Sequence, residues 1–251
     1  MKSHFKQIVT IVLSIFLLSC STDDSSSEVP PSGIPPTTEV PTKPLPSFIN
    51  YLALGDSYTI GQSVCETCRY PEQLKASLKA IYPQTNFSLK VIAQTGWTTS
   101  DLISAINSVN PDSNYDLVTL LIGVNNQYQG RDFSIYEKEF PELVNKAITL
   151  AKGDKKNVIV LSIPDYAYTP FGTIQMQGQG TRISNEINQY NILAENYCTI
   201  NGIVFISITD ITRNGLIKPS LVANDGLHPS AEAYSLFTER ILPKVKAALQ
   251  N

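Results

Sequence analysis

One serine and one histidine carry the most specific chemistry that this sequence offers. Ser57 ends the run Ala-Leu-Gly-Asp-Ser, and His228 lies near the C-terminus in the run Asp-Gly-Leu-His-Pro. His4 falls in a predicted export segment, so His228 is the only remaining imidazole that could activate Ser57. A serine with a histidine base performs acyl transfer. Asp225, three residues before His228, is suited to orient its ring.

The elements that would position these residues alternate along the chain. Short apolar strands are predicted at 51–54, 87–93, 117–122, 157–163 and 203–208. Helices are predicted from Pro71 to the residue before Pro83, and at 98–108, 133–152, 183–201 and 231–249. This alternation predicts an α/β fold, a five-stranded parallel sheet with helices on both faces.

Polar residues follow the first three predicted strands. Gly-Asp-Ser57 follows the first strand, Gln-Thr-Gly96 the second, and Gly-Val-Asn125-Asn126 the third. Ligands of such sheets bind beyond the carboxyl ends of the strands. We therefore expect these loops to meet in one cleft. Taken alone, Ser57 would equally suit the N-cap of a helix.

Together these loops resemble the GDSL family of serine hydrolases, also called the SGNH hydrolases. That family is named for a Ser, a Gly, an Asn and a His in four separated blocks. The matching residues here, in the same order, are Ser57, Gly96, Asn125 and His228. One departure is Asn126, where the family commonly has Asp. The resemblance implies a flavodoxin-like three-layer α/β/α sandwich.

The resemblance also implies a mechanism. Ser57 would be the nucleophile, and His228 would act as general base and then as general acid, with Asp225 fixing the imidazole tautomer. An oxyanion would lie among the backbone N–H groups of Ser57 and Gly96 and the side-chain amide of Asn125. The reaction would be a two-step hydrolysis of a carboxylic ester through an acyl-serine, without a metal or an organic cofactor. Family substrates include acetylated sugars, lysophospholipids, acyl thioesters and simple lipids.

Four residues beside these positions are candidates for substrate contact: Tyr58, Trp97, Asn126 and Gln127. Trp97, next to Gly96, could form a wall of the acyl pocket or pack in the core. The segment 166–180 is rich in Tyr, Gly and Gln. It could form a rim of the site or be a solvated connection.

The cysteines of the predicted domain have three possible uses. Cys65 and Cys68 form the run Cys-Glu-Thr-Cys, which favours a local structural disulfide in an oxidising compartment. A thioredoxin-like redox pair is an alternative, although such a pair normally opens a helix directly after a strand. A zinc site would need four ligands, and His228, the only histidine of the predicted domain, is assigned to catalysis. Cys198 is expected to be buried on a helix.

The N-terminal residues predict export. Residues 1–19 have a short basic start and an apolar run, as in a signal peptide. The run Leu-Leu-Ser-Cys20 resembles a bacterial lipobox, in which Cys20 is lipidated; an ordinary cleaved signal peptide is the alternative. Residues 20–47 are rich in Pro and Ser and predict a disordered tether before a domain at 48–251. We expect a lipid-anchored, extracytoplasmic protein of the bacterial cell envelope.

Charge and context limit the partners. The chain has a formal net charge of −3 and no basic block, which argues against a nucleic-acid partner. The expected substrate is a small-molecule, glycan or lipid ester, with acetylated carbohydrate and lysophospholipid as leading classes. Membrane contact would be through the lipid anchor alone. The rival hypothesis is a non-catalytic ligand-binding lipoprotein on the same fold.

Overall fold

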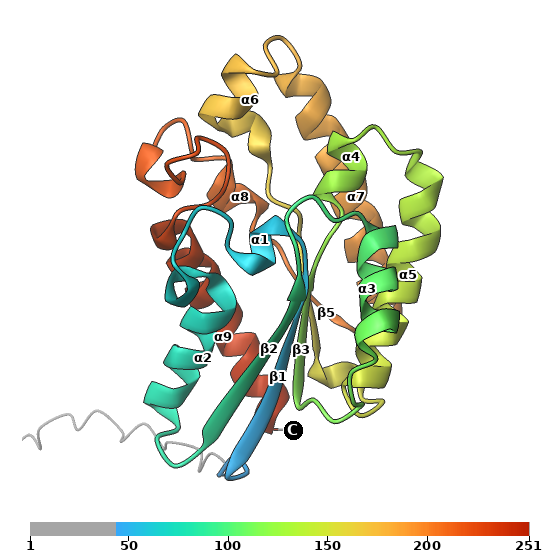
Figure 1. Ribbon diagram of the computed structural model, residues 1–251, viewed down its shortest axis with the longest axis vertical. Coiled ribbons are helices and arrows are strands. Elements are labelled where there is room, and N and C mark those ends of the chain that lie inside the picture. Colours follow the sequence, from blue (N-terminus) through green and yellow to red (C-terminus); the bar gives the residue numbers. More distant parts are fainter. Residues whose placement is uncertain (1–43, 251) are drawn as a thin grey trace, which may run out of the picture. The chain divides into compact units, whose positions relative to one another are not determined.

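The computed structural model describes residues 44–250, and the segment 1–19 and Cys20 lie outside them. Five parallel strands form one sheet in the order β2-β1-β3-β4-β5 (Figure 1). Their bounds are β1 Phe48–Gly55, β2 Asn86–Ala93, β3 Leu117–Leu121, β4 Val158–Leu161 and β5 Val204–Ile206. The strand order is that of the flavodoxin-like doubly wound fold, as the sequence predicts.

Helices cover both faces of this sheet (Figure 1). Helices α2 and α9 pack together on one face, and α3, α5 and α7 lie on the other. The longer helices are α2 Tyr70–Ile81, α3 Thr99–Val109, α5 Phe133–Leu150, α7 Gly180–Asn201 and α9 Ala231–Gln250. Between residues 44 and 250, no helix combines the length and apolar character needed to cross a membrane.

Local sequence explains why these elements begin and end where they do. Every residue of β3 and β4 is buried, which matches their continuous apolar runs. Helix α3 begins at a capping box in which Thr98 and Asp101 satisfy each other's backbone N–H groups. Helix α7 ends where Gly202 adopts a left-handed conformation.

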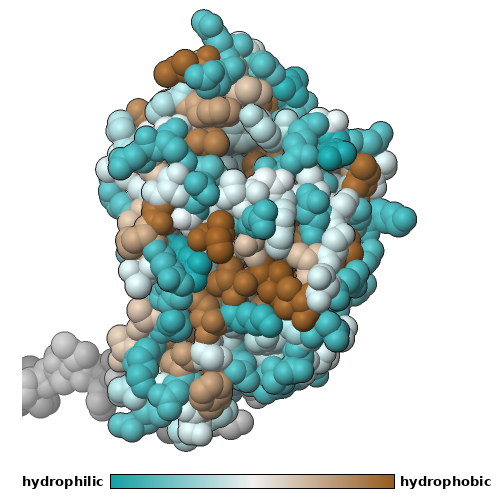
Figure 2. All heavy atoms as spheres, in the orientation of Figure 1, coloured by the Kyte–Doolittle hydropathy of each residue, from teal (hydrophilic) through white to brown (hydrophobic). Residues whose placement is uncertain are grey.

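The edge strand β2 is less covered than the strands inside the sheet. Most of its residues are only half-buried, and Phe87, Leu89 and Val91 pack partly against the core. An apolar band crosses the middle of the face shown in Figure 2, in the region where β2 lies between α2 and α3. Helices α2 and α3 flank β2 without covering it fully. Buried and exposed residues therefore do not alternate cleanly along this strand.

Four short helices are not predicted from the sequence: α1 Ser57–Ile60, α4 Val124–Tyr128, α6 Pro170–Ile174 and α8 Thr209–Thr212. Each is only four or five residues long, so none repeats an apolar position often enough to produce a helical pattern. Three of them contribute to the cleft described below.

The topology places one strand at the switch point of the sheet. Strand β1 lies between β2 and β3, and Gly55 at its end pairs with Ala93 of β2 and Leu121 of β3. The three strands therefore end at one level, and the loops that follow them share one edge. Ligands of doubly wound sheets bind at such a point.

Candidate active site

Ser57 lies in a tight turn between β1 and α1. Asp56 caps the helix by accepting a hydrogen bond from the Tyr58 N–H at 3.0 Å. Ser57 is the first helical residue, so its own N–H has no partner within the helix. Gly55 is needed because a Cβ there would lie 2.1 Å from the Thr59 hydroxyl oxygen. This close approach lets the chain turn sharply and present the serine at the end of the strand.

Asp225 and His228 are joined through side chain and backbone. The distance from His228 Nδ1 to Asp225 Oδ2 is 2.6 Å. Asp225 Oδ1 accepts hydrogen bonds from the backbone N–H groups of Leu227 and His228, at 2.9 and 3.0 Å. Partial burial alone would raise the pKa of Asp225, but hydrogen bonds, the largest from Ser63 and His228, lower that pKa to about 2. An ionised Asp225 therefore faces the imidazole at neutral pH.

The imidazole of His228 is also held by packing. Its ring meets the ring of Tyr58 edge-on, with centroids 5.6 Å apart. His228 is 8% exposed and Tyr58 is 3% exposed. Because Asp225 engages Nδ1, the other ring nitrogen is the one that can exchange a proton with a serine. His228 and Ser57 line the same cavity.

Two loops supply donors beside this serine. Gly96 has φ +87°, and nothing lies within 4 Å of a Cβ built there. Glycine is therefore favoured here by the left-handed backbone and not by crowding, because a Cβ would not collide with any described protein atom. Asn125, in α4, donates from Nδ2 to the Trp97 carbonyl at 2.9 Å. Within the described residues, no hydrogen bond engages the N–H groups of Ser57 or Gly96.

The cavity has a volume of about 220 Å³. Its polar lining residues are Ser57, Thr95, Asn125 and His228, together with Gly96. Its aromatic and aliphatic lining residues are Tyr58, Val124, Tyr128, Tyr166, Phe171 and Leu227. A serine hydroxyl, an imidazole and backbone N–H groups without a partner among the described residues therefore share one cavity with apolar side chains. Such an arrangement suits acyl transfer.

Three aromatic residues of that pocket were not predicted: Tyr128, Tyr166 and Phe171. We call these three the aromatic wall. The ring centroids of Tyr128 lie 5.9 Å from those of Tyr166 and 6.1 Å from those of Phe171. Tyr166 begins the short helix Tyr166–Tyr168 and Phe171 lies in α6. The composition of segment 166–180 was the only signal in the sequence that pointed to this part of the rim.

Two of the predicted substrate contacts, Asn126 and Gln127, do not line the cavity. Asn126 is fully buried and binds both the N–H and the hydroxyl of Thr99, at 3.0 and 2.7 Å, so it supports the start of α3. Gln127 donates to Glu186 and accepts from the Tyr166 hydroxyl at 2.9 Å, so it supports the aromatic wall. Neither side chain lines the cavity, because both point from α4 into the protein.

Of the other two candidates for substrate contact, Tyr58 lies in the cavity lining and the Trp97 side chain does not. Tyr58 lines the cavity beside His228, and its contact with substrate stays a prediction. The Trp97 side chain is not among the lining residues and packs partly against the core, which is the alternative that the sequence left open. Trp97 reaches the site through its backbone carbonyl, on which Asn125 is fixed.

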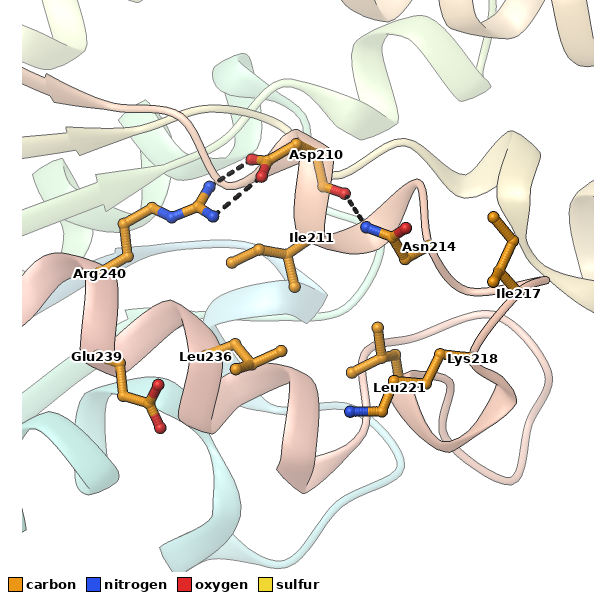
Figure 3. A pocket seen from close by; sticks show the side chains of 9 residues that line it. All are labelled: Asp210, Ile211, Asn214, Ile217, Lys218, Leu221, Leu236, Glu239 and Arg240. Carbon is orange, nitrogen blue, oxygen red and sulfur yellow. Dashed lines mark hydrogen bonds and ion pairs between the residues drawn. The ribbon is translucent and has the colours of Figure 1, made fainter. Parts of the chain in front are cut away.

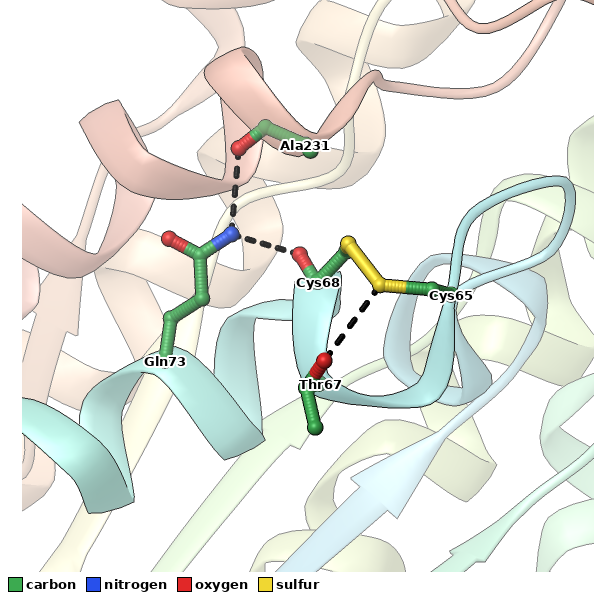
Figure 4. The surroundings of a disulfide bond; sticks show 5 residues. All are labelled: Cys65, Thr67, Cys68, Gln73 and Ala231. Atoms are coloured by element: carbon green, nitrogen blue, oxygen red, sulfur yellow. Dashed lines mark hydrogen bonds between the residues drawn. A yellow bond between two sulfur atoms is a disulfide. The ribbon is translucent and has the colours of Figure 1, made fainter.

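Cys65 and Cys68 form a disulfide, with Cα atoms 5.0 Å apart (Figure 4). This disulfide lies within the loop between α1 and α2. Cys198 is buried in α7, and burial raises the pKa of its thiol to about 12. With Cys65 and Cys68 joined as a disulfide, they offer no thiolates to a metal.

A larger hollow lies elsewhere, between α8 and α9 (Figure 3). Its volume is about 660 Å³, and its apolar side is formed by Ile211, Leu221 and Leu236. Two of its charged lining residues, Arg240 and Asp210, already form an ion pair with each other. No serine or histidine lines this hollow, so its size does not make it the catalytic cavity.

Solved structures with the same fold include several ester hydrolases. A lipolytic protein of the G-D-S-L family from Veillonella parvula is 20% identical, with 78% of this chain and 97% of that chain covered and a TM-score of 0.59. An acetylxylan esterase from Geobacillus stearothermophilus is 20% identical, with 81% and 96% covered and a TM-score of 0.58. A lipase/acylhydrolase from Enterococcus faecalis is 18% identical, with 79% and 96% covered and a TM-score of 0.59.

Two comparisons of the sequence were informative in different degrees. A comparison with curated proteins gives no match. The model of the GDSL-like lipase/acylhydrolase family matches residues 53–236, a stretch that contains Ser57, Gly96, Asn125 and the Asp225–His228 pair. The chain therefore belongs to the GDSL-like lipase/acylhydrolase family and is a carboxylic ester hydrolase.

Proposed function

We propose that Ser57, His228 and Asp225 form the catalytic triad of this esterase. His228 takes the proton of the Ser57 hydroxyl as its oxygen attacks the ester carbonyl, and then gives that proton to the departing alcohol. Water hydrolyses the acyl-serine by the same steps in the second half of the reaction. The observation that carries this proposal is the 2.6 Å contact of His228 Nδ1 with Asp225, in a cavity that Ser57 also lines.

Asn125, Gly96 and Ser57 would stabilise the oxyanion. An amide nitrogen carries two hydrogens, and one hydrogen bond to the Trp97 carbonyl leaves the second free. The N–H groups of Ser57 and Gly96 have no partner among the described residues. Donors that are fixed before the reaction stabilise charge without reorganising, and each is worth about 3–4 kcal/mol.

The pocket supports a small-to-medium acyl group. The cavity has a volume of about 220 Å³, and aromatic and aliphatic side chains make up much of its lining. The aromatic wall lines this cavity, and we infer that its rings favour a short acyl chain over a long one. We propose an acetylated carbohydrate or a short-chain lipid ester as substrate; the fold neighbour from Geobacillus stearothermophilus is an acetylxylan esterase.

Hydrolysis of nitrophenyl esters of graded acyl length by the full-length protein tests this function. We expect kcat/KM to be highest for short acyl chains and to fall for long ones. Ser57→Ala is the control that must abolish turnover, and Ser104→Ala, an exposed serine in α3, must not change it. Hydrolysis of every ester with Ser57→Ala at the wild-type rate would contradict the proposal.

The same assay addresses the rival function, a non-catalytic ligand-binding lipoprotein. A binder would retain the pocket but would show no Ser57-dependent turnover. The intact set of triad and oxyanion residues favours the enzyme, because binding alone does not need all five.

We also propose a location. Export followed by lipidation at Cys20 would anchor the enzyme in the bacterial cell envelope, with residues 20–47 as a tether. The disulfide supports an oxidising, extracytoplasmic compartment. Metabolic labelling with a fatty-acid probe should mark the wild-type protein and leave Cys20→Ser unmarked; equal labelling of both would contradict lipidation at this residue.

A further inference from the structure

Among the described residues, the Asp225 carboxylate has one hydrogen-bond partner from outside its own segment. Three of its four hydrogen bonds come from Leu227 and His228, two and three residues away. The fourth comes from Ser63, whose hydroxyl donates to Oδ2 at 2.6 Å across 162 positions of sequence. The Asp225 side chain is 29% exposed, so water can compete for this oxygen. Ser63 is therefore the group that ties the carboxylate to the segment carrying Ser57.

The backbone of Ser63 is in an unfavourable conformation. Its φ is +67°, in the left-handed region where a residue with a Cβ is strained. Glycine or asparagine would be easier to place there. Strain of this kind persists where the surroundings require it. The hydrogen bond to Asp225 is a reason for a hydroxyl-bearing side chain at this position.

The loop that presents Ser63 is fastened on both sides. On its N-terminal side, the N–H groups of Gly61 and Gln62 bind the Ser57 carbonyl at 3.1 and 3.0 Å. On its C-terminal side, the Cys65–Cys68 disulfide closes a short ring within the chain.

Gln73 fastens the disulfide end to the segment that follows His228. Its side-chain amide donates to the Cys68 carbonyl at 2.5 Å and to the Ala231 carbonyl at 3.0 Å (Figure 4). Ala231 is the first residue of α9, three positions after His228. The loop contacts the Asp225–Ala231 segment directly through Ser63, and Gln73 of α2 links the end of the loop to the same segment.

We propose that Ser63 is a positioning residue for ester hydrolysis, holding the Asp225 carboxylate against the His228 imidazole. This inference rests on the proposed triad. Without the hydroxyl, Asp225 Oδ2 can turn toward solvent and the imidazole loses its fixed orientation. The orientation matters most when charge develops on the ring in the transition state, so the loss falls on kcat rather than on KM.

Ser63→Ala and Ser63→Gly in the full-length protein separate hydroxyl from backbone. Both lack the donor, but only glycine relieves the left-handed strain. We expect kcat for a nitrophenyl acetate to fall roughly 10- to 150-fold in both, as for loss of a hydrogen bond to a charged group, with KM nearly unchanged. Asn110→Ala is the matched control, because it places alanine at another left-handed position, φ +42°, outside the cavity lining. It should keep wild-type kcat.

A double-mutant cycle tests whether Ser63 acts through Asp225. In an Asp225→Asn background, Ser63→Ala should lower kcat by less than about twofold, because the group it positions is already lost. A general structural role would lower kcat by the same factor in both backgrounds and would overturn the proposal. So would a Ser63→Gly enzyme with wild-type kcat. Failure of the triad itself would appear separately, as wild-type turnover that survives Ser57→Ala.

Discussion

The side-chain amide of Asn125 donates a 2.9 Å hydrogen bond to the backbone carbonyl of Trp97. This bond joins the loop after β3 to the loop after β2. Because Gly96 directly precedes Trp97, it also fixes the spacing between two proposed oxyanion donors. Asn125 is therefore positioned before any substrate binds.

Asn125→Ala should lower kcat about 10²- to 10³-fold and leave KM nearly unchanged, because the amide binds charge that develops only in the transition state. Steady-state kinetics on a short nitrophenyl ester give both constants. Asn107→Ala, an exposed asparagine of α3 bonded to Lys146, is the matched control. A loss mainly in KM would make Asn125 a substrate-binding residue instead.

Asp56 should make the stability of the fold depend on pH. The residue is fully buried, and among the described residues its Oδ2 has no hydrogen-bond partner. Burial raises the pKa of Asp56 from 3.8 to about 7, although the bond from Tyr58 opposes this. A raised folded-state pKa means that the contribution to stability is complete below about pH 4 and is lost as pH rises through about 7.

The Asp56→Asn variant tests this. Urea unfolding of the wild type should show the free energy of unfolding falling between about pH 4 and pH 7 and levelling off above that range. The fall should be on the order of 4 kcal/mol at most, since one pKa unit is worth about 1.4 kcal/mol. The asparagine variant should lose most of that slope. An unchanged slope would mean that other groups govern the pH dependence.

The aromatic wall should set the acyl length. Phe171→Ala removes a ring from the cavity and should raise kcat/KM for an octanoyl ester relative to an acetyl ester about tenfold or more. Tyr168→Ala is the control, since Tyr168 is exposed, lies beside the wall and does not line the cavity. Equal chain-length profiles for the wild type and Phe171→Ala would place the acyl group elsewhere.

Removing the disulfide should have a modest effect. The ring between Cys65 and Cys68 is short, so its stabilisation should lie at or below the low end of the usual 2–4 kcal/mol. Cys65→Ser with Cys68→Ser should lower thermal stability slightly and kcat less than about tenfold, through a loosened Ser63. Complete loss of hydrolysis in a folded double variant would make the cysteines part of the chemistry. Mass spectrometry of the unreduced protein should find only Cys198 free among the three.

Sequence patterns predicted the sheet and the long helices, because each repeats an apolar position often enough to be recognised. They also predicted that Ser57, Gly96 and Asn125 share one edge, since all three follow parallel strands. They did not predict the aromatic wall, because Tyr166 and Phe171 lie in an irregular segment whose path has no periodic signal. Likewise, the bond from Ser63 to Asp225 depends on how two distant loops pack.

Asn126 shows the limit of inference from neighbours in sequence. It directly follows Asn125, yet consecutive residues of a helix point in different directions. Asn125 therefore faces the cavity while Asn126 is buried against Thr99. Adjacency to a site residue predicted contact with substrate, but the helical geometry of α4 directs Asn126 away from the cavity lining.

Covalent labelling with a fluorophosphonate tests the nucleophile most directly. Attack by an activated serine on the phosphorus atom leaves a stable adduct that peptide mass spectrometry can locate. We expect one adduct per chain, on Ser57, absent in Ser57→Ala and formed at least about 10³-fold more slowly in His228→Ala. Ser104→Ala should label like the wild type. An adduct on another residue, or labelling of His228→Ala at the wild-type rate, would contradict the proposed catalytic site.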